Sequence, residues 1–235
     1  MVDVAILITV SVINILLAFI VVSRNYKSKA NRLYGLMVLS VIFWSICNFL
    51  TNTVTQFSLS LIINRVSFAA GYLMALSVWF FSINFPYSIK VNKYQKSLVW
   101  IISPIVVILS LTSVFVETVN YNPEKQITDI TPGALYYLYV LAAMFLLGTA
   151  AVNFIKVYRS NLTTNVARRQ LIYTAIGIVC TFLWILMTAA VVPLVTGDWT
   201  ISRYASLGTI FLVSFIAYAI VKHRLFDIPD AETGY

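Results

Sequence analysis

The sequence predicts an all-α membrane protein, a seven-transmembrane helix bundle with its N-terminus outside the cell and its C-terminus in the cytoplasm. The first observation is composition, since 60% of the 235 residues are hydrophobic and only 10% are charged. A soluble domain carries about 25% charged residues and could not cover so much apolar surface with polar groups. The second observation is that the apolar residues gather into seven runs, each long enough to cross a bilayer.

Each of the seven runs is predicted to form one uninterrupted helix. The first run begins Met1-Val2-Asp3, without the basic start or the cleavage site of a signal peptide, so we expect it to be retained. No linker or repeat divides the chain, which favours one domain over residues 1–228 and a short cytoplasmic tail over 229–235. The runs cover Val4–Val22, Leu33–Val54, Val66–Phe85, Leu98–Val116, Leu135–Val157, Leu171–Val195 and Tyr204–Val221.

The basic residues predict the direction of the helices. Most of the 16 Lys and Arg residues fall in alternate breaks between the runs, or just after the last run. Because short loops rich in Lys and Arg stay in the cytoplasm, these breaks are predicted to be cytoplasmic. The net charge of +8 is then a topology signal in a protein surrounded by the lipid bilayer, and we expect no nucleic-acid partner. These residues are Arg24, Lys27, Lys29, Arg32, Lys90, Lys93, Lys96, Lys156, Arg159, Arg168, Arg169, Lys222 and Arg224.

The longest connection between runs lies on the predicted outer side, over about residues 117–134. It contains the turn signals Asn122-Pro123 and Pro132-Gly133 around the β-prone stretch Gln126–Thr131. Two interpretations remain open at this point, a small hairpin over the outer mouth of the bundle or a disordered polar loop.

The residues that usually perform membrane chemistry are missing from the runs. Their middles hold no Asp, Glu, Lys, Arg or His, the side chains typical of proton relays and ion-coupled transport. The only histidine, His223, follows the last run and cannot build a metal site alone. Cys47 and Cys180 lie singly in apolar runs and are expected to pack as small side chains. We therefore expect no catalytic residue, no metal and no cofactor.

Polar residues near the predicted outer ends of the runs are candidates for ligand binding. Asn48 and Asn52 are four residues apart and share one helix face. One interpretation is a cavity open to the outside, in which Arg65 and Arg203 meet an anionic or polar ligand. The other is that the amides form interhelical hydrogen bonds and the arginines extend to the lipid headgroups. The candidate ligand residues are Asn48, Asn52, Arg65, Tyr72, Asp198 and Arg203.

Four segments stand out in order along the chain, and together they resemble one known family. They are Asn31-Arg32-Leu33-Tyr34-Gly35-Leu36 with Trp44; Pro132-Gly133-Ala134-Leu135-Tyr136-Tyr137; Arg168-Arg169-Gln170-Leu171 with Gly177 and Pro193; and the exit of the last run from Ala217 to Ile228. In this order they resemble the N-terminal seven-transmembrane sensory region of prokaryotic sensor histidine kinases. The resemblance covers nearly the whole chain.

The resemblance implies a sensory domain in the cell membrane of a prokaryote, whose last helix passes into a cytoplasmic histidine kinase or other output module. Signalling in that family proceeds in a dimer, so a homodimer is expected. The chain ends at Tyr235 with no phospho-accepting histidine motif or ATP-binding segment, so the output module is expected in cis or in trans and this chain is not expected to be an enzyme. The ligand would be an unknown small molecule. The expected signal-transmitting residues are Lys222, His223, Arg224, Leu225, Phe226, Asp227 and Ile228.

Two other functions remain open. A small-solute transporter or channel would need discontinuous helices and polar groups at the middle of the membrane, and the uninterrupted runs argue against it. A scaffold or assembly subunit is the third interpretation, which a stable co-purifying partner would identify.

Overall fold

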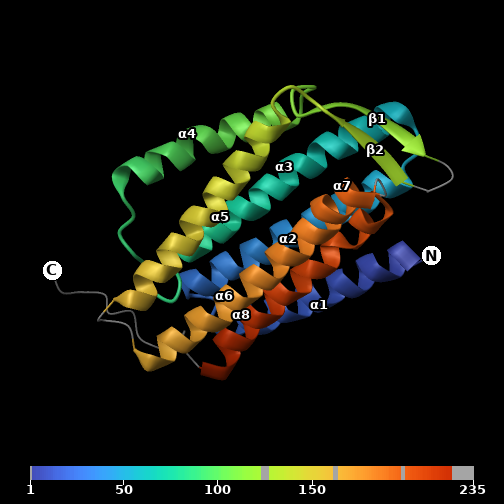
Figure 1. Ribbon diagram of the computed structural model, residues 1–235. Coiled ribbons are helices and arrows are strands. Elements are labelled where there is room, and N and C mark those ends of the chain that lie inside the picture. The colour runs from blue at the N-terminus through green and yellow to red at the C-terminus, as the bar shows by residue number, and fades with distance from the viewer. Residues whose placement is uncertain (1, 123–126, 161–163, 197–198, 224–235) are drawn as a thin grey trace.

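The computed structural model describes residues 2–122, 127–160, 164–196 and 199–223. Long helices run along one common axis, and a two-stranded hairpin lies at one end of them (Figure 1). The helices are α1 (Val2–Arg24), α2 (Lys29–Thr53), α3 (Phe57–Ser82), α4 (Lys93–Ser110), α5 (Tyr136–Arg159), α6 (Asn165–Leu186), α7 (Val192–Thr196) and α8 (Thr209–His223); the strands are β1 (Val116–Asn122) and β2 (Ile127–Pro132).

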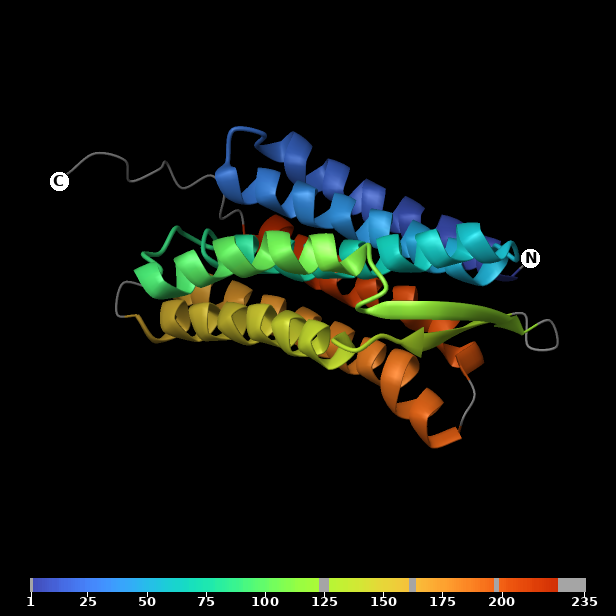
Figure 2. The ribbon, with the colours of Figure 1, turned by 90° about the horizontal axis from the view of Figure 1, so that it is seen from above.

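The prediction of a helical membrane protein is confirmed. Within the described residues, six helices are long and apolar enough to cross a membrane. The exception among the long helices is α4, which has 18 residues and carries Lys93 and Lys96 in its first turn. At 1.5 Å per residue it is about 27 Å long, and it lies alongside α3 and α5 (Figures 1 and 2). That α4 forms a seventh crossing remains a prediction.

Several predicted helix boundaries are wrong. At the basic residues, α4 begins at Lys93 and α6 at Asn165, five and six residues before the expected Leu98 and Leu171. Two further errors lie near the hairpin. The third run was expected to begin at Val66, but α3 begins at Phe57, because polar residues at the end of a helix do not stop it from forming. The fourth run was expected to reach Val116, but α4 ends at Ser110. The chain then turns and enters β1, whose β-branched valines and threonine favour a strand.

The connection predicted to lie outside forms a hairpin in its described residues, so the disordered-loop interpretation is wrong for them. Strands β1 and β2 pair antiparallel, with Val119 opposite Ile130. The hairpin is joined to the bundle, because the Thr128 hydroxyl donates to the Thr51 carbonyl of α2 at 2.7 Å.

The expectation of uninterrupted helices is also wrong. After Leu186 the sixth helix widens into a π-helix, Met187–Val191, before α7. Pro193 lacks a backbone N–H and cannot donate to the carbonyl four residues earlier, which accounts for the irregular turn before it. The last run is irregular too, since Trp199–Gly208 is a 3-10 helix and regular α-helix starts at Thr209.

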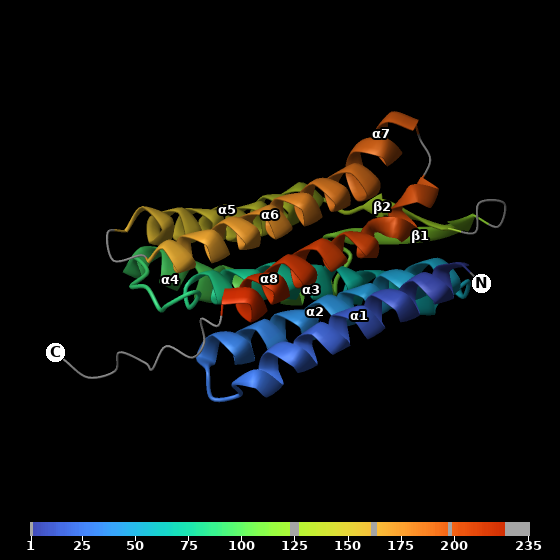
Figure 3. The same cartoon turned by 90° about the horizontal axis from the view of Figure 1, so that it is seen from below.

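The two ends of the bundle differ in charge. The α1–α2 and α3–α4 connections, the end of α5, the start of α6 and the end of α8 lie at one end (Figures 1 and 3). We call this the basic end, since Lys27, Lys90, Lys156 and Arg169 lie there. The hairpin lies at the opposite end and carries Glu117.

The last helix lies at the centre of the bundle. In the segment Tyr204–Lys222, which includes most of α8, 56% of the residues are buried. In the segment Leu7–Arg24 of α1, 17% of the residues are buried. Figure 3 shows α8 between α6 on one side and α1 and α2 on the other. Its side chains Val213 and Ile216 are fully buried there. A change in any of these three neighbours would therefore act directly on α8.

Candidate functional site

The candidate site is a set of hydrogen bonds from neighbouring helices to α8 and to the 3-10 helix before it. All but one of the donors reach a backbone carbonyl, and the remaining donor reaches a threonine hydroxyl. We call these side chains the α8 donors. They are Asn14 and Arg24 of α1, Tyr34 of α2, and Gln170, Thr181 and Trp184 of α6.

Two of the α8 donors act in the buried part of α8. The Tyr34 hydroxyl donates to the Val213 carbonyl at 3.0 Å, and the Gln170 side-chain amide donates to the Ala219 carbonyl at 3.0 Å. Both donor side chains are fully buried. Since lipid offers no water to satisfy a polar group, each donor needs a partner within the protein. These two bonds therefore connect α2 and α6 to fixed positions on the α8 backbone.

Three more α8 donors act where the 3-10 helix joins α8. The Thr181 hydroxyl donates to the Gly208 carbonyl at 2.8 Å, and the Trp184 indole donates to the Tyr204 carbonyl at 2.9 Å. The side-chain amide of Asn14 donates to the Thr209 hydroxyl at 3.4 Å. Hydrogen-bond geometry is poorer in 3-10 helices than in α-helices, so their carbonyls accept side-chain donors readily.

The exit of α8 is held at the basic end. Arg24 donates from Nη1 to the Val221 carbonyl at 3.3 Å. Val221 lies in the last turn of α8 that the structure describes, so this bond holds α1 against the end of the described helix. Lys222 contacts the Tyr218 hydroxyl and lies 4.8 Å from the centre of that ring. Tyr218 meets Tyr173 of α6 edge to face, with ring centres 5.0 Å apart.

Some polar atoms beside α8 have no partner. Within the described part of the chain, Asn14 Oδ1, Gln170 Oε1 and Thr174 Oγ1 make no hydrogen bond. All three side chains are fully buried. A buried polar atom left without a partner costs about 1–3 kcal/mol, so the present packing around α8 does not satisfy every group that faces it.

The helices beside α8 also approach one another closely at a glycine. A Cβ atom placed on Gly177 of α6 would lie 2.8 Å from the Cβ of Phe215 on α8. This distance is shorter than ordinary van der Waals contact, so only glycine fits there without displacement of α8.

Among the described residues, the predicted ligand residues Asn48, Asn52, Arg65 and Tyr72 make separate contacts. Arg65 of α3 donates from Nε and Nη2 to the Val116 carbonyl of β1, at 3.2 and 3.1 Å. The buried Tyr72 contacts the Ser103 hydroxyl of α4 at 3.3 Å. The Asn52 side chain donates to the Asn48 carbonyl in its own helix at 3.0 Å. These contacts favour the interhelical hydrogen-bonding interpretation for Tyr72 and a hairpin anchor for Arg65, and the ligand site remains a prediction.

The other predicted residues are only partly described. Asp198 and the exit residues Arg224, Leu225, Phe226, Asp227 and Ile228 lie outside the described residues. The side chains of Arg203 in the 3-10 helix and His223 at the end of α8 also lie outside them. Of the predicted signal-transmitting residues, Lys222 is the one whose side-chain contacts are defined.

Sequence reasoning assigned none of the α8 donors to the site, although a signal for some of them was present. Asn14 and Thr181 are polar residues inside strongly apolar runs, where a polar side chain needs a partner. Tyr34 and Gln170 belong to segments that resembled the known family, but they were not assigned a contact. Hydropathy could not identify their acceptors, because these are mainly backbone carbonyls, which every residue has.

A family model described as the N-terminal 7TM region of histidine kinase matches residues 6–229. No curated protein matches the chain. The matched region contains all of the α8 donors.

Proposed function

Because the chain belongs to the family of N-terminal seven-transmembrane regions of histidine kinases, we propose that it is a membrane sensory domain. It passes an external or membrane signal to a cytoplasmic histidine kinase or other output module. The observation that carries this proposal is the position of α8, which is central, contacts α1, α2 and α6 through the α8 donors, and leaves the bundle at the basic end.

The proposed topology has seven crossings in the cell membrane of a prokaryote, with α4 as the fourth. The N-terminus is outside and the C-terminus is in the cytoplasm. The gathering of lysines and arginines at one end of the bundle supports this direction, because positively charged connections stay in the cytoplasm. The sensory domain covers residues 1–228 and the tail covers 229–235.

The proposed signal is a displacement of α8 relative to its neighbours. Backbone carbonyls recur along a helix, with an equivalent acceptor about 5.4 Å away after each turn. A donor such as Tyr34 can therefore exchange one carbonyl for the next, as in known one-turn shifts of helices. The unpartnered Asn14 Oδ1, Gln170 Oε1 and Thr174 Oγ1 support a second packing in which these atoms are paired. The segment from Lys222 to Ile228 transmits the displacement, in a homodimer, to the output module.

An unknown small molecule is proposed to bind at the hairpin end. The candidates remain Asn48, Asn52, Arg65, Tyr72, Asp198 and Arg203. Arg65 supports this location because it is partly buried and bonded to a single carbonyl of β1. A guanidinium has five N–H donors, so an anionic ligand would compete with Val116 for Arg65 and loosen the hairpin.

The test uses the protein isolated with its output module from native membranes, and kinase autophosphorylation with ATP is measured. The proposal requires the exit to continue as a helix beyond Lys222. Three residues inserted there would then turn the following segment by about 300°, and we expect altered output with an unchanged thermal transition of the bundle. Seven inserted residues turn it by about 700°, close to the original direction, and are expected to restore most of the output. The proposal fails if no output module is found in cis or in trans, or if both insertions leave its activity unchanged.

A small-solute transporter or channel is the second candidate, and the interrupted helices favour it. The π-helix Met187–Val191 and the 3-10 helix Trp199–Gly208 are the kind of break that lines substrate sites in transporters. Both breaks lie near the hairpin end, however, whereas transporter sites lie near the middle of the membrane (Figure 1). Solute flux into liposomes containing the purified protein would support this alternative.

A further inference from the structure

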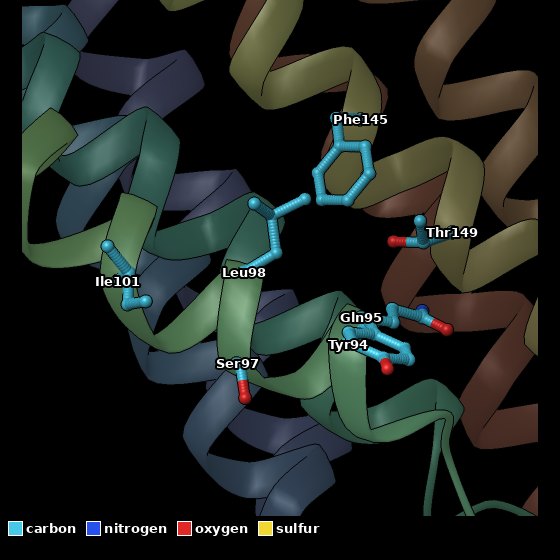
Figure 4. Close-up of a pocket in the computed structure, with 7 residues that line it drawn as sticks. All are labelled: Tyr94, Gln95, Ser97, Leu98, Ile101, Phe145 and Thr149. Carbon is cyan, nitrogen blue, oxygen red and sulfur yellow. The ribbon is translucent and has the colours of Figure 1, made fainter.

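A groove separates α4 from α5 on the outside of the bundle. The two helices lie close together near the hairpin and diverge toward the basic end (Figure 1). The groove between them has a volume of about 510 Å³. Its walls are the first half of α4 and the middle of α5, as the close-up in Figure 4 shows. In the proposed topology α4 crosses the membrane, so this outward-facing surface would be surrounded by lipid; the inference rests on that topology.

The part of the groove farther from the basic end is apolar. Leu98 and Ile101 of α4 and Phe145 of α5 line it, and Figure 4 shows Leu98 facing Phe145 across the gap. Leu98 is 43% exposed and Ile101 is 62% exposed, so neither side chain is covered by the protein. These walls suit a hydrocarbon chain.

Polar groups follow toward the basic end. Tyr94, Gln95 and Ser97 line the groove in the first turns of α4. Gln95 Nε2 has no hydrogen-bond partner among the residues that the structure describes, although the atom is buried. The groove therefore offers an unused donor at the level where its walls change from apolar to polar.

Beyond the apolar and polar parts of the groove, positively charged side chains lie at the basic end. Phe145, Thr149 and Lys156 are spaced by four and seven residues, so they share one face of α5. On α4, Lys93 lies four residues before Ser97 and one turn closer to the basic end. Both lysines are exposed. The acidic side chains that the structure describes lie in the hairpin at the other end, so none of them neutralises these lysines.

We propose that this groove binds an anionic phospholipid from the leaflet at the basic end. An acyl chain lies between Leu98 and Phe145, the ester oxygens accept from Gln95, and the phosphate lies near Lys93 and Lys156. From Lys93 to Ile101 the order of charged, polar and apolar groups covers eight residues, or about 12 Å of helix. A phospholipid has the same order from its phosphate through its esters to its chains. Charge complementarity selects a single anionic lipid over the zwitterionic lipids that surround any membrane protein.

The test reconstitutes the full chain in nanodiscs of equal phosphatidylglycerol and phosphatidylcholine and identifies retained lipids by native mass spectrometry. Wild-type protein is expected to retain phosphatidylglycerol preferentially. A lysine near a membrane surface contributes about 1 kcal/mol to the attraction of anionic lipid, so K93Q or K156Q should each lower the ratio of the two lipids about fivefold. The double variant K27Q/K29Q removes two exposed lysines at the same end, Lys27 of the α1–α2 connection and Lys29 at the start of α2. It should leave the ratio within about twofold, because both lie away from the groove.

A second pair of variants tests the apolar wall. T149L narrows the groove beside Phe145 and should lower retention of the bound lipid, whereas V12L introduces the same side chain on the exposed face of α1 and should not. Circular dichroism checks that both variants are folded. Equal retention of the two lipids, an equal loss in K27Q/K29Q, full retention in T149L, or a second copy of the chain in place of the lipid would overturn the proposal.

Discussion

At the scale of single residues, the contacts of α8 combine neutral donors with backbone acceptors. Inside the bundle the donors are amides, hydroxyls and one indole, and the charged Arg24 acts only at the basic end. Such hydrogen bonds contribute about 0.6 kcal/mol each in membrane proteins. The coupling free energy between two ligand sites is typically about 1–3 kcal/mol. Breaking a few of these hydrogen bonds costs no more than that. The polar contacts are strong enough to define a position of α8 and weak enough to be changed by a signal.

Two threonines of α6 allow the energetic contribution of one α8 donor to be tested, because the same substitution can be made at both positions. Thr181 and Thr174 are both buried, but only Thr181 has a hydrogen bond, to the Gly208 carbonyl. Threonine to valine keeps the shape and removes the hydroxyl. We expect T181V to lower the free energy of unfolding by about 1 kcal/mol, because it leaves a partner unpaired. T174V removes an unpartnered hydroxyl and should leave stability unchanged or raise it. Unfolding of both variants in mixed micelles, followed by circular dichroism, measures the difference; equal losses would contradict the assignment.

How much of the site the sequence could predict depends on the kind of contact. Lys222 was assigned to signal transmission from the family resemblance. It contacts Tyr218 near the end of α8, and its role stays a prediction. Asn14 and Gln170 were not assigned, since a polar residue in an apolar run shows that a partner is needed but not which one. Arg65 was expected to face a ligand or the headgroups, and its contact with Val116 depends on a hairpin register that no local pattern gives.

At the scale of elements, the hairpin is attached to the bundle through few polar contacts. Arg65 holds the first residue of β1, and Thr128 holds β2 against α2. Hydrogen bonds from charged groups contribute about 1.5–3 kcal/mol. Arg65 is therefore expected to be the main polar attachment of β1.

Replacement of Arg65 by glutamine tests this attachment. We expect amide hydrogen exchange in Val116–Asn122 to become about tenfold faster in R65Q, which corresponds to a loss of about 1.4 kcal/mol, the low end of the range for a charged hydrogen bond. R169Q, which alters an exposed arginine at the basic end, is the control and should leave exchange in the hairpin unchanged. Unchanged exchange in R65Q would mean that apolar packing alone holds the strand.

The spacing between α6 and α8 is set by Gly177. G177A would place a methyl group 2.8 Å from the Cβ of Phe215, so the helices must separate. Overpacking of this kind costs about 1–3 kcal/mol, and we expect the thermal transition to fall. Gly148 of α5 is the matched control, because a Cβ there meets no atom within 4 Å. G148A should be neutral or stabilising, since alanine is favoured over glycine in a helix by about 1 kcal/mol. Equal effects of the two substitutions would show that α6 and α8 are free to move apart.

The elements themselves were predicted well where apolar content alone decides them. Six of the seven runs correspond to helices that meet the length and hydropathy of a membrane span. The errors lie where hydrogen bonding decides instead. The π-helix before Pro193 follows from a missing N–H. The start of α3 was missed because the predicted run was begun after the polar pair Asn64 and Arg65, although the residues before this pair are largely apolar.

At the scale of the whole molecule, the number of membrane crossings decides on which side of the membrane the basic connections lie. If α4 crosses the membrane, the α3–α4 connection and the hairpin lie on opposite sides, and the lysines of that connection join those of the α1–α2 connection. If α4 does not cross, Lys90 and Lys93 would lie on the same side as the hairpin. The positive-inside rule favours the first arrangement, and the position of α4 along the bundle axis agrees with it (Figure 2).

Labelling of single cysteines decides between these arrangements. In a background with Cys47 and Cys180 replaced by alanine, we place S88C in the α3–α4 connection and N120C in the hairpin; both positions are exposed. A maleimide that cannot cross membranes should label N120C in intact cells from which any outer layers are removed. It should label S88C only in inverted vesicles. S28C in the α1–α2 connection should behave like S88C, because both connections are predicted to be cytoplasmic. Labelling of S88C and N120C from the same side would show that α4 lies along the membrane or outside it. The bundle would then have six crossings, and its termini would share one side of the bilayer.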